Sequence, residues 1–171
     1  MVDGALSDLL TALEEQGGLD EAALVLVGLH GEEFFEHGGA LHGFSLHEES
    51  LRVPLVIRAP ALLAPGRVTA PVDLLDLAPT LADLLGLPFP AQWQGDSLVP
   101  LIDDPQPPPR LVVAYLGDGA RAAILGDYKL IVGSGRDAQK LYDLAADGRW
   151  KRSRWGTGAD LKPAFALDHG M

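Results

Sequence analysis

The chain has 171 residues, 47% of them hydrophobic, which predicts a globular protein of one domain or one domain with a small appendage. Its 13 basic and 24 acidic residues give a formal net charge of −11, which argues against nucleic acid or an anionic membrane as the main partner and is compatible with cation binding. The absence of cysteine excludes disulfides, thiolate metal sites and cysteine nucleophiles. No apolar run reaches the roughly 18 residues of a membrane span, and the first residues lack the pattern of a signal peptide. These residues alone predict a cytoplasmic chain, but the compartment stays open.

The first part of the chain has the pattern of an α/β protein. Residues 2–16 are predicted to form an amphipathic helix, because leucines recur at helical spacing and two glycines follow. Residues 23–27 and 53–57 are short continuous apolar runs, which are typical of parallel strands buried on both faces under helices. We therefore expect a partial α/β layer of parallel strands with flanking helices.

A second helix is predicted over residues 76–85. Asp76 can cap its start, Pro79 falls in its first turn, where a missing N–H costs little, and Gly86 can end it. Four leucines are expected to form its buried stripe. They are Leu77, Leu81, Leu84 and Leu85.

The clearest boundary is residues 103–110, where three consecutive prolines predict a stiff connector. Beyond it the pattern is typical of a small antiparallel sheet, with turn residues between short apolar runs. The predicted strands are residues 111–116, 120–125, 128–132 and 140–144. The expected parts of the chain are therefore the α/β part (1–102), the connector (103–110), the sheet subdomain (111–147) and a tail (148–171).

The stretch from residue 28 to residue 42 concentrates polar chemistry. It contains three of the five histidines and three glutamates, directly after a predicted strand, and ligands of open α/β sheets bind at the carboxyl ends of strands. Imidazole and carboxylate groups suit Zn, Mn or Ca-like ions. Loops rich in Glu are also commonly just solvated, so composition alone leaves open a metal site, a substrate site and a plain surface loop.

The order of short motifs in this stretch resembles the second metal-site motif of the sulfatases, in the alkaline-phosphatase-like superfamily. The matching pieces are His30-Gly31-Glu32, Glu36-His37-Gly38, His42-Gly43, Leu46-His47-Glu48-Glu49 and Arg52-Val53-Pro54-Leu55. Further pieces follow in the family's order at residues 76–81, 95–98, 128–130 and 141–144. The resemblance covers nearly the whole chain to about residue 147.

The resemblance implies roles for three residues. His30 matches a metal ligand or the residue beside the metal, and His42 matches a position that contacts an oxygen of the substrate sulfate or phosphate. Glu32 matches the motif glutamate, which supports the metal ligands without binding the metal itself. For His37 we expect a structural or supporting role and not that of a ligand. The implied cofactor is a divalent ion, Ca or Mn, bound weakly because Leu29 stands where the family has a metal-binding aspartate.

A second departure from the family is larger. The matched region lacks the family's N-terminal half, which carries the Cys or Ser that matures to formylglycine and the first pair of metal aspartates. We therefore expect a sulfatase-like sulfuric ester hydrolase chain that is inactive alone and needs the missing half from a partner chain. Many relatives are exported, which leaves the localisation unknown.

Two alternative functions stay open at this point. The first is a degenerate sulfatase-like pseudoenzyme, kept as a binding or assembly module with a partner chain or as a homo-oligomer. The second is part of a phosphodiesterase or phosphoethanolamine-transferase-like enzyme of the same superfamily, because the loop motif does not separate a sulfate ester from a phosphate ester.

Overall fold

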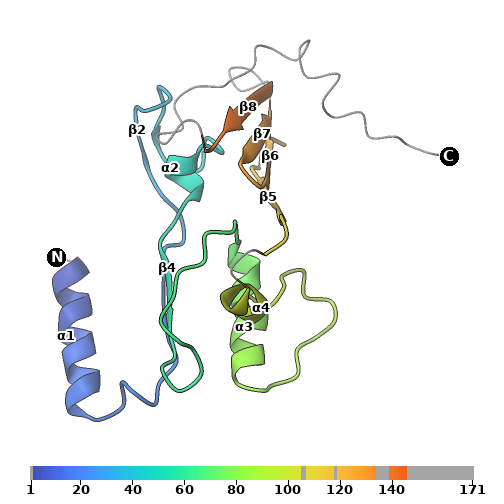
Figure 1. The fold of residues 1–171 in the computed structure, drawn as a ribbon. Helices are drawn as coiled ribbons and strands as arrows, with labels where there is room; N and C mark the ends of the chain where they lie inside the picture. Colours follow the sequence, from blue (N-terminus) through green and yellow to red (C-terminus); the bar gives the residue numbers. More distant parts are fainter. Residues whose placement is uncertain (1, 105–106, 118, 134–138, 146–171) are drawn as a thin grey trace. The chain divides into compact units, whose positions relative to one another are not determined.

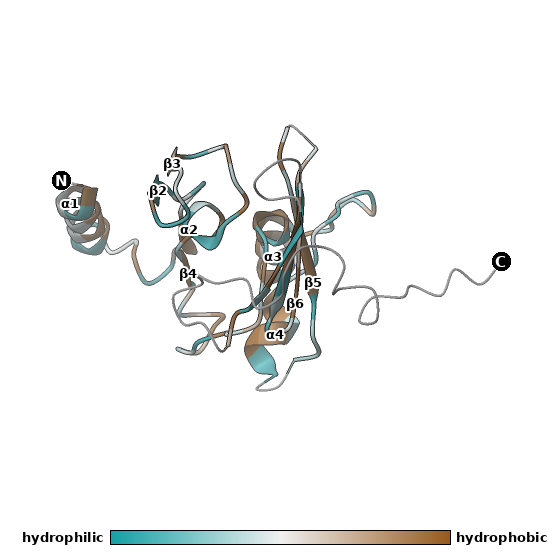
Figure 2. Cartoon of the chain, turned by 90° about the horizontal axis from the view of Figure 1, so that it is seen from above, coloured by the Kyte–Doolittle hydropathy of each residue, from teal (hydrophilic) through white to brown (hydrophobic). Residues whose placement is uncertain are grey.

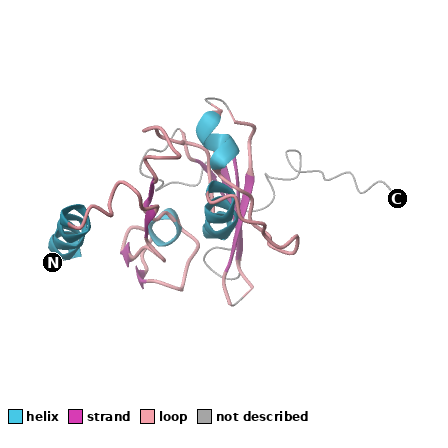
Figure 3. Ribbon diagram, turned by 90° about the horizontal axis from the view of Figure 1, so that it is seen from below, coloured by secondary structure: helices cyan, strands magenta, loops and turns pink. Residues whose placement is uncertain are grey.

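The structure is a computed structural model that describes residues 2–104, 107–117, 119–133 and 139–145 (Figure 3). The described residues form two compact units, one made of residues 2–29 and 53–67, the other of residues 30–52 and those from 68 onward. The expected tail at 148–171 lies outside the described residues. Within the described part of the chain, no helix is long and apolar enough to cross a bilayer.

The first unit contains one helix and a pair of strands. Helix α1 (Val2–Glu15) and strands β1 (Leu24–Val27) and β4 (Leu55–Arg58) confirm the predicted elements. Helix α1 carries both apolar and polar residues but has none buried (Figure 2). Arg58 on β4 pairs with Asp20 at 2.7 Å, which ties this strand to the segment before β1.

The α/β class is confirmed, but the two apolar strands are not parallel. Strands β1 and β4 pair antiparallel, with Leu24 opposite Arg58 and Val27 opposite Leu55. They are also only half-buried, since Leu26 is 40% and Val56 is 54% exposed. A continuous apolar run indicates burial but carries no information on strand direction, which is why the prediction failed here.

The second unit contains the predicted antiparallel sheet (Figure 1). Its strands are adjacent in chain order: β5 (Leu111–Tyr115), β6 (Arg121–Leu125), β7 (Tyr128–Val132) and β8 (Gln139–Asp143). Side chains alternate along each strand, so one face of the sheet is available for packing. That face carries a hydrophobic cluster that includes Leu46, which follows the histidine-rich stretch in the chain. Its buried members are Leu46, Ala120, Ala122, Ile131 and Tyr142.

The predicted second helix begins one short element earlier than expected. A 3₁₀ helix η1 (Leu74–Asp76) leads into α3 (Leu77–Leu84), and α4 (Val99–Asp103) follows. The cap of η1 is Asp73, whereas the side chain of Asp76 caps nothing in α3, which corrects the prediction. The leucine stripe is also wrong as predicted, because α3 buries Pro79, Thr80 and Ala82 while Leu85 is 56% exposed.

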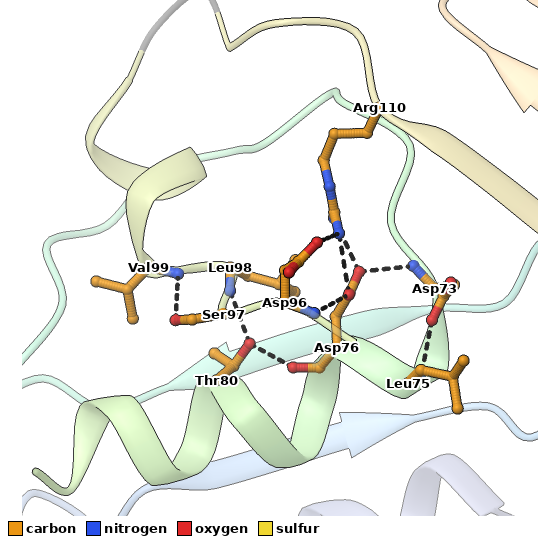
Figure 4. A network of polar contacts seen from close by, with 9 residues as sticks. All are labelled: Asp73, Leu75, Asp76, Thr80, Asp96, Ser97, Leu98, Val99 and Arg110. Atoms are coloured by element: carbon orange, nitrogen blue, oxygen red, sulfur yellow. Dashed lines mark hydrogen bonds and ion pairs between the residues drawn. The ribbon is translucent and has the colours of Figure 1, made fainter. Parts of the chain in front are cut away.

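Asp76 has a different task, which Figure 4 shows. Its buried carboxylate accepts hydrogen bonds from Asp73 N at 3.1 Å and from Asp96 N at 2.9 Å. It also forms a bidentate ion pair with Arg110. Burial opposes ionisation of Asp76, but the hydrogen bonds from Arg110 and the two amides outweigh it and hold its pKa below the usual range. Thr80 adds a link, accepting from Leu98 N at 2.8 Å.

Candidate functional site

Residues 30–52 carry most of the histidine-rich stretch and belong to the second unit. They contain the short strands β2 (Glu33–Phe34) and β3 (Ala40–Leu41), which pair with each other, and helix α2 (Glu48–Leu51). Gly31 N donates to Ser50 O at 2.9 Å, which fastens the start of the loop to α2. A Cβ atom at Gly31 would overlap the carbonyl oxygen of Glu49, so the close approach requires glycine.

Three of the four residues singled out by the sequence lie together. The His30 and His42 rings stack at a centroid distance of 3.9 Å and an angle of 23°. His42 Nδ1 lies 3.0 Å from Glu32 Oε2, and His30 Nδ1 lies 2.9 Å from Gly31 O. Both contacts use Nδ1, so Nε2 is the ring nitrogen through which either histidine could contact a ligand. The group can therefore present imidazole nitrogens to an anion or a metal from a partly exposed surface.

His37, the fourth residue, lies in a separate and more buried cluster. Its Nδ1 contacts Glu49 Oε1, and its ring stacks on His47 at 3.7 Å with an angle of 2°. Tyr142 of β8 meets both rings edge-on, at 5.7 Å from His47 and 6.2 Å from His37. His37 therefore lies between the loop, helix α2 and the sheet, where its partners are Glu49, His47 and Tyr142.

The loop between β2 and β3 is held by a buried carboxylate and carries backbone strain. Glu33 is buried and accepts from Ser45 Oγ. Phe35 and Leu41 have φ values of 69° and 72°, in the left-handed region that non-glycine residues seldom adopt. Strain of this kind concentrates where a loop has to hold side chains in fixed directions. Leu41 directly precedes His42, so this strain lies next to the predicted substrate contact.

Sequence reasoning missed one residue that contacts this region. The sequence places Lys129 only within the strand predicted over residues 128–132, yet Lys129 is 1% exposed and its Nζ lies 2.5 Å from Glu48 Oε1 of α2. Burial lowers the pKa of Lys129, while the charges of Glu48 and Glu49 oppose that change. Two signals in the sequence could have indicated it: a lysine within a short apolar strand, and its place in the piece at residues 128–130 that resembles the family.

The donor atoms of the described residues do not by themselves fit a divalent ion. Among the described residues, no three His, Asp or Glu side chains lie where they could hold a metal together. Leu29, where the resemblance implies an aspartate, offers no ligand atom. The assignments of His30 to a metal and of His42 to a substrate oxygen therefore stay predictions.

Comparison with known proteins decides the family. The family model described as Sulfatase matches residues 1–87, about half of the chain. The chain belongs to the sulfatase family. The match includes the whole loop that carries His30 and His42, so the resemblance seen in the sequence is confirmed.

Individual sulfatases are similar over larger stretches. Arylsulfatase K from Danio rerio is 36% identical over 100 residues, which cover 58% of this chain and 19% of that protein. Choline-sulfatase from Rhizobium meliloti (strain 1021) is 30% identical over 153 residues, covering 85% of this chain and 29% of the relative. The sulfatase-family chain described here thus spans only a fifth to a third of the length of these curated relatives.

Solved structures share the fold over nearly the whole chain. BT4656, solved in complex with its substrate D-glucosamine-2-N,6-O-disulfate, has a TM-score of 0.73 at 27% identity and covers 95% of this chain and 35% of its own. Phosphonate monoester hydrolase SpPMH from Silicibacter pomeroyi has a TM-score of 0.74 at 22% identity, covering 95% of this chain and 36% of its own. The second likeness shows the fold alone.

Proposed function

We propose that this chain contributes the oxyanion-contact loop of a sulfuric ester hydrolase, with His42 as the residue that contacts a sulfate oxygen. The observation that supports this most directly is the contact of His42 Nδ1 with Glu32, made on a loop that belongs to the sulfatase family. When Nδ1 donates to the carboxylate, a protonated ring presents Nε2–H to an anionic oxygen. Such a donor stabilises negative charge on a transferring group.

His30 has a related but separate role in this proposal. It stacks on His42, which limits the rotation of both rings, and its Nε2 can supply one ligand atom to a divalent ion such as Ca or Mn. The other ligands would have to come from outside the described residues, since Leu29 cannot supply one. Glu32 orients His42, while His37 supports the loop from the side of α2.

The same proposal holds that the 171-residue chain does not turn over a sulfate ester alone. The matched region lacks the part of the family that carries the Cys or Ser from which the nucleophile matures, and the 171 residues contain no cysteine. Loss of one transition-state contact costs on the order of 3 kcal/mol, and loss of the nucleophile and of most metal ligands costs far more. Complementation by a chain that carries those groups would restore turnover.

Hydrolysis of an aryl sulfate by the purified chain tests this proposal. We expect no release of the phenol above a His30→Ala/His42→Ala double variant, and we expect turnover when a complementing N-terminal sulfatase segment is added. Turnover by the chain alone that the double variant lacks would refute the claim of inactivity. A parallel assay with an aryl phosphate distinguishes a sulfate-ester enzyme from a phosphate-ester enzyme of the same superfamily.

One observation favours a second candidate, a binding or assembly module. Leu29, at the position where the resemblance implies a metal-binding aspartate, is 80% exposed. Within the second unit, Phe34 and Phe35 are each 74% exposed and Phe44 is 76% exposed, and several exposed aromatic side chains in one segment are typical of an interaction surface. Leu29→Asp, measured with a complementing N-terminal segment present, separates the two candidates, because it would strengthen cation binding in an enzyme part and would not do so in a binding module.

A further inference from the structure

Lys129 is the most deeply buried cation among the described residues, and one carboxylate lies beside it. It lies on β7, 1% exposed, with Nζ 2.5 Å from Glu48 Oε1 in the first turn of α2. A buried ammonium is costly unless it is paired, so the contact fixes where α2 can lie against the sheet. The crevice beside the pair, which His47 and Tyr142 also line, has no room for a water molecule.

Tyr142 makes a second contact from the same face of the sheet. It lies opposite Lys129 in the strand register, is 3% exposed, and meets the stacked rings of His37 and His47 with its own ring edge-on. Edge-to-face contacts of this kind are directional. His47 directly precedes α2, while His37 lies in the middle of the loop, so the sheet contacts the loop at two places.

Helix α2, which contacts Lys129 of the sheet, is also hydrogen-bonded to the backbone beside the residues of the proposed site. Ser50 O accepts from Gly31 N at 2.9 Å, and there is no space at Gly31 for even a methyl group. His30 directly precedes Gly31, and its ring stacks on His42. A shift of α2 therefore moves the backbone at Gly31 and changes the stacking of the two rings.

We propose that the four-stranded sheet is part of the functional site, with Lys129 and Tyr142 as positioning residues that fix α2 and, through it, the geometry of His30 and His42. The functional meaning of this inference rests on the proposed role of His42. Neither residue touches the proposed ligand. Their effect is to hold the two imidazoles in one arrangement, so that no binding energy is used to order them.

The test uses Lys129→Met in the full 171-residue chain, which keeps the length and apolar stem of the side chain and removes its charge. Arg121→Met is the matched control, because Arg121 is an exposed cation on neighbouring strand β6. Imidazole NMR signals are assigned with single His→Gln variants, and the nuclear Overhauser contact between the His30 and His42 rings is measured.

We expect Lys129→Met to shift the His30 and His42 signals and to lose the contact between their rings, while Arg121→Met leaves both unchanged. Unchanged signals and an intact ring contact in a folded Lys129→Met protein would overturn the inference. If this variant does not fold, Lys129→Met/Glu48→Gln replaces it, because it removes both members of the pair, and the same two outcomes apply.

Sulfate added to the unchanged chain separates the inference from the proposed function. Rings that move in Lys129→Met but do not respond to sulfate in the unchanged chain mean that positioning holds and the proposed role of His42 fails. When both hold, Lys129→Met weakens sulfate binding at least several-fold and Arg121→Met does not.

Discussion

Arg110 donates hydrogen bonds to both carboxylate oxygens of Asp76, with Nη1–Oδ2 at 2.8 Å and Nη2–Oδ1 at 3.0 Å. The two residues are 34 positions apart, and Asp76 is 1% exposed. This pair joins the start of α3 to the segment that enters β5. It therefore holds the sheet, with Lys129 and Tyr142, to the helices of the second unit.

Arg110→Met is expected to destabilise the protein strongly, because it leaves the buried carboxylate of Asp76 without a countercharge. The expected loss in the free energy of unfolding is about 3–5 kcal/mol, measured by urea denaturation at neutral pH. Arg67→Met is the control, since Arg67 is exposed. An Arg110→Met variant no less stable than Arg67→Met would contradict this account of the pair.

Asp76 also predicts part of the acid sensitivity of the fold. Its pKa is lower in the folded protein than in the unfolded chain, so the unfolded chain takes up the proton first as pH falls. The stability that its charge supplies is thus full above the unfolded pKa of about 3.9 and is lost as pH falls through the folded value. The stability difference between the unchanged protein and Asp76→Asn should therefore shrink from pH 7 to pH 3. An equal difference at both pH values would show that ionisation of Asp76 does not matter.

Thr80 offers a finer test of the same network. Its hydroxyl donates to Asp76 O at 2.6 Å and accepts from Leu98 N. Thr80→Val keeps the shape but leaves a buried amide without an acceptor, so the free energy of unfolding should fall by about 1–3 kcal/mol. Thr80→Ser retains the hydroxyl and should recover most of that loss in the same denaturation experiment. Equal losses in the two variants would point to packing of the methyl group instead.

Gly31 is expected to be intolerant of any side chain. Alanine would overlap the carbonyl oxygen of Glu49, and the backbone of α2 would have to move at a cost of about 3 kcal/mol. Gly66→Ala is a suitable comparison, because nothing lies within 4 Å of the added methyl group. The melting temperatures of the two variants are compared by circular dichroism. Equal melting temperatures of the Gly31→Ala and Gly66→Ala proteins would show that the loop is not fastened to α2 as described.

Local patterns predicted the elements well where the signal is local. Short apolar runs separated by turn residues predict β5 to β8, and leucines at helical spacing followed by glycines predict α1. The structure confirms all five elements. Periodicity gives no strand direction, so the antiparallel pairing of β1 and β4 could not be predicted from it.

Long-range polar pairs were the other limit of the sequence. Lys129 and Glu48 are 81 positions apart, and a lysine in a strand is ordinarily exposed, so only the fold shows that the two charges meet. The position of Asp76 at the start of the predicted helix predicts a cap. Its carboxylate instead binds Arg110 and two backbone amides. The histidines of the loop are predicted from the sequence, because three of the five lie within fifteen residues.

The central claim, that the loop presents His42 to a sulfate oxygen, is tested most directly by following the imidazole NMR signal of His42 during titration with sodium sulfate at constant ionic strength. The account predicts a saturable shift of His42 with sulfate, none with chloride, and loss of the response in the other loop signals in His42→Gln. A His42 signal that moves no more with sulfate than with chloride would contradict it.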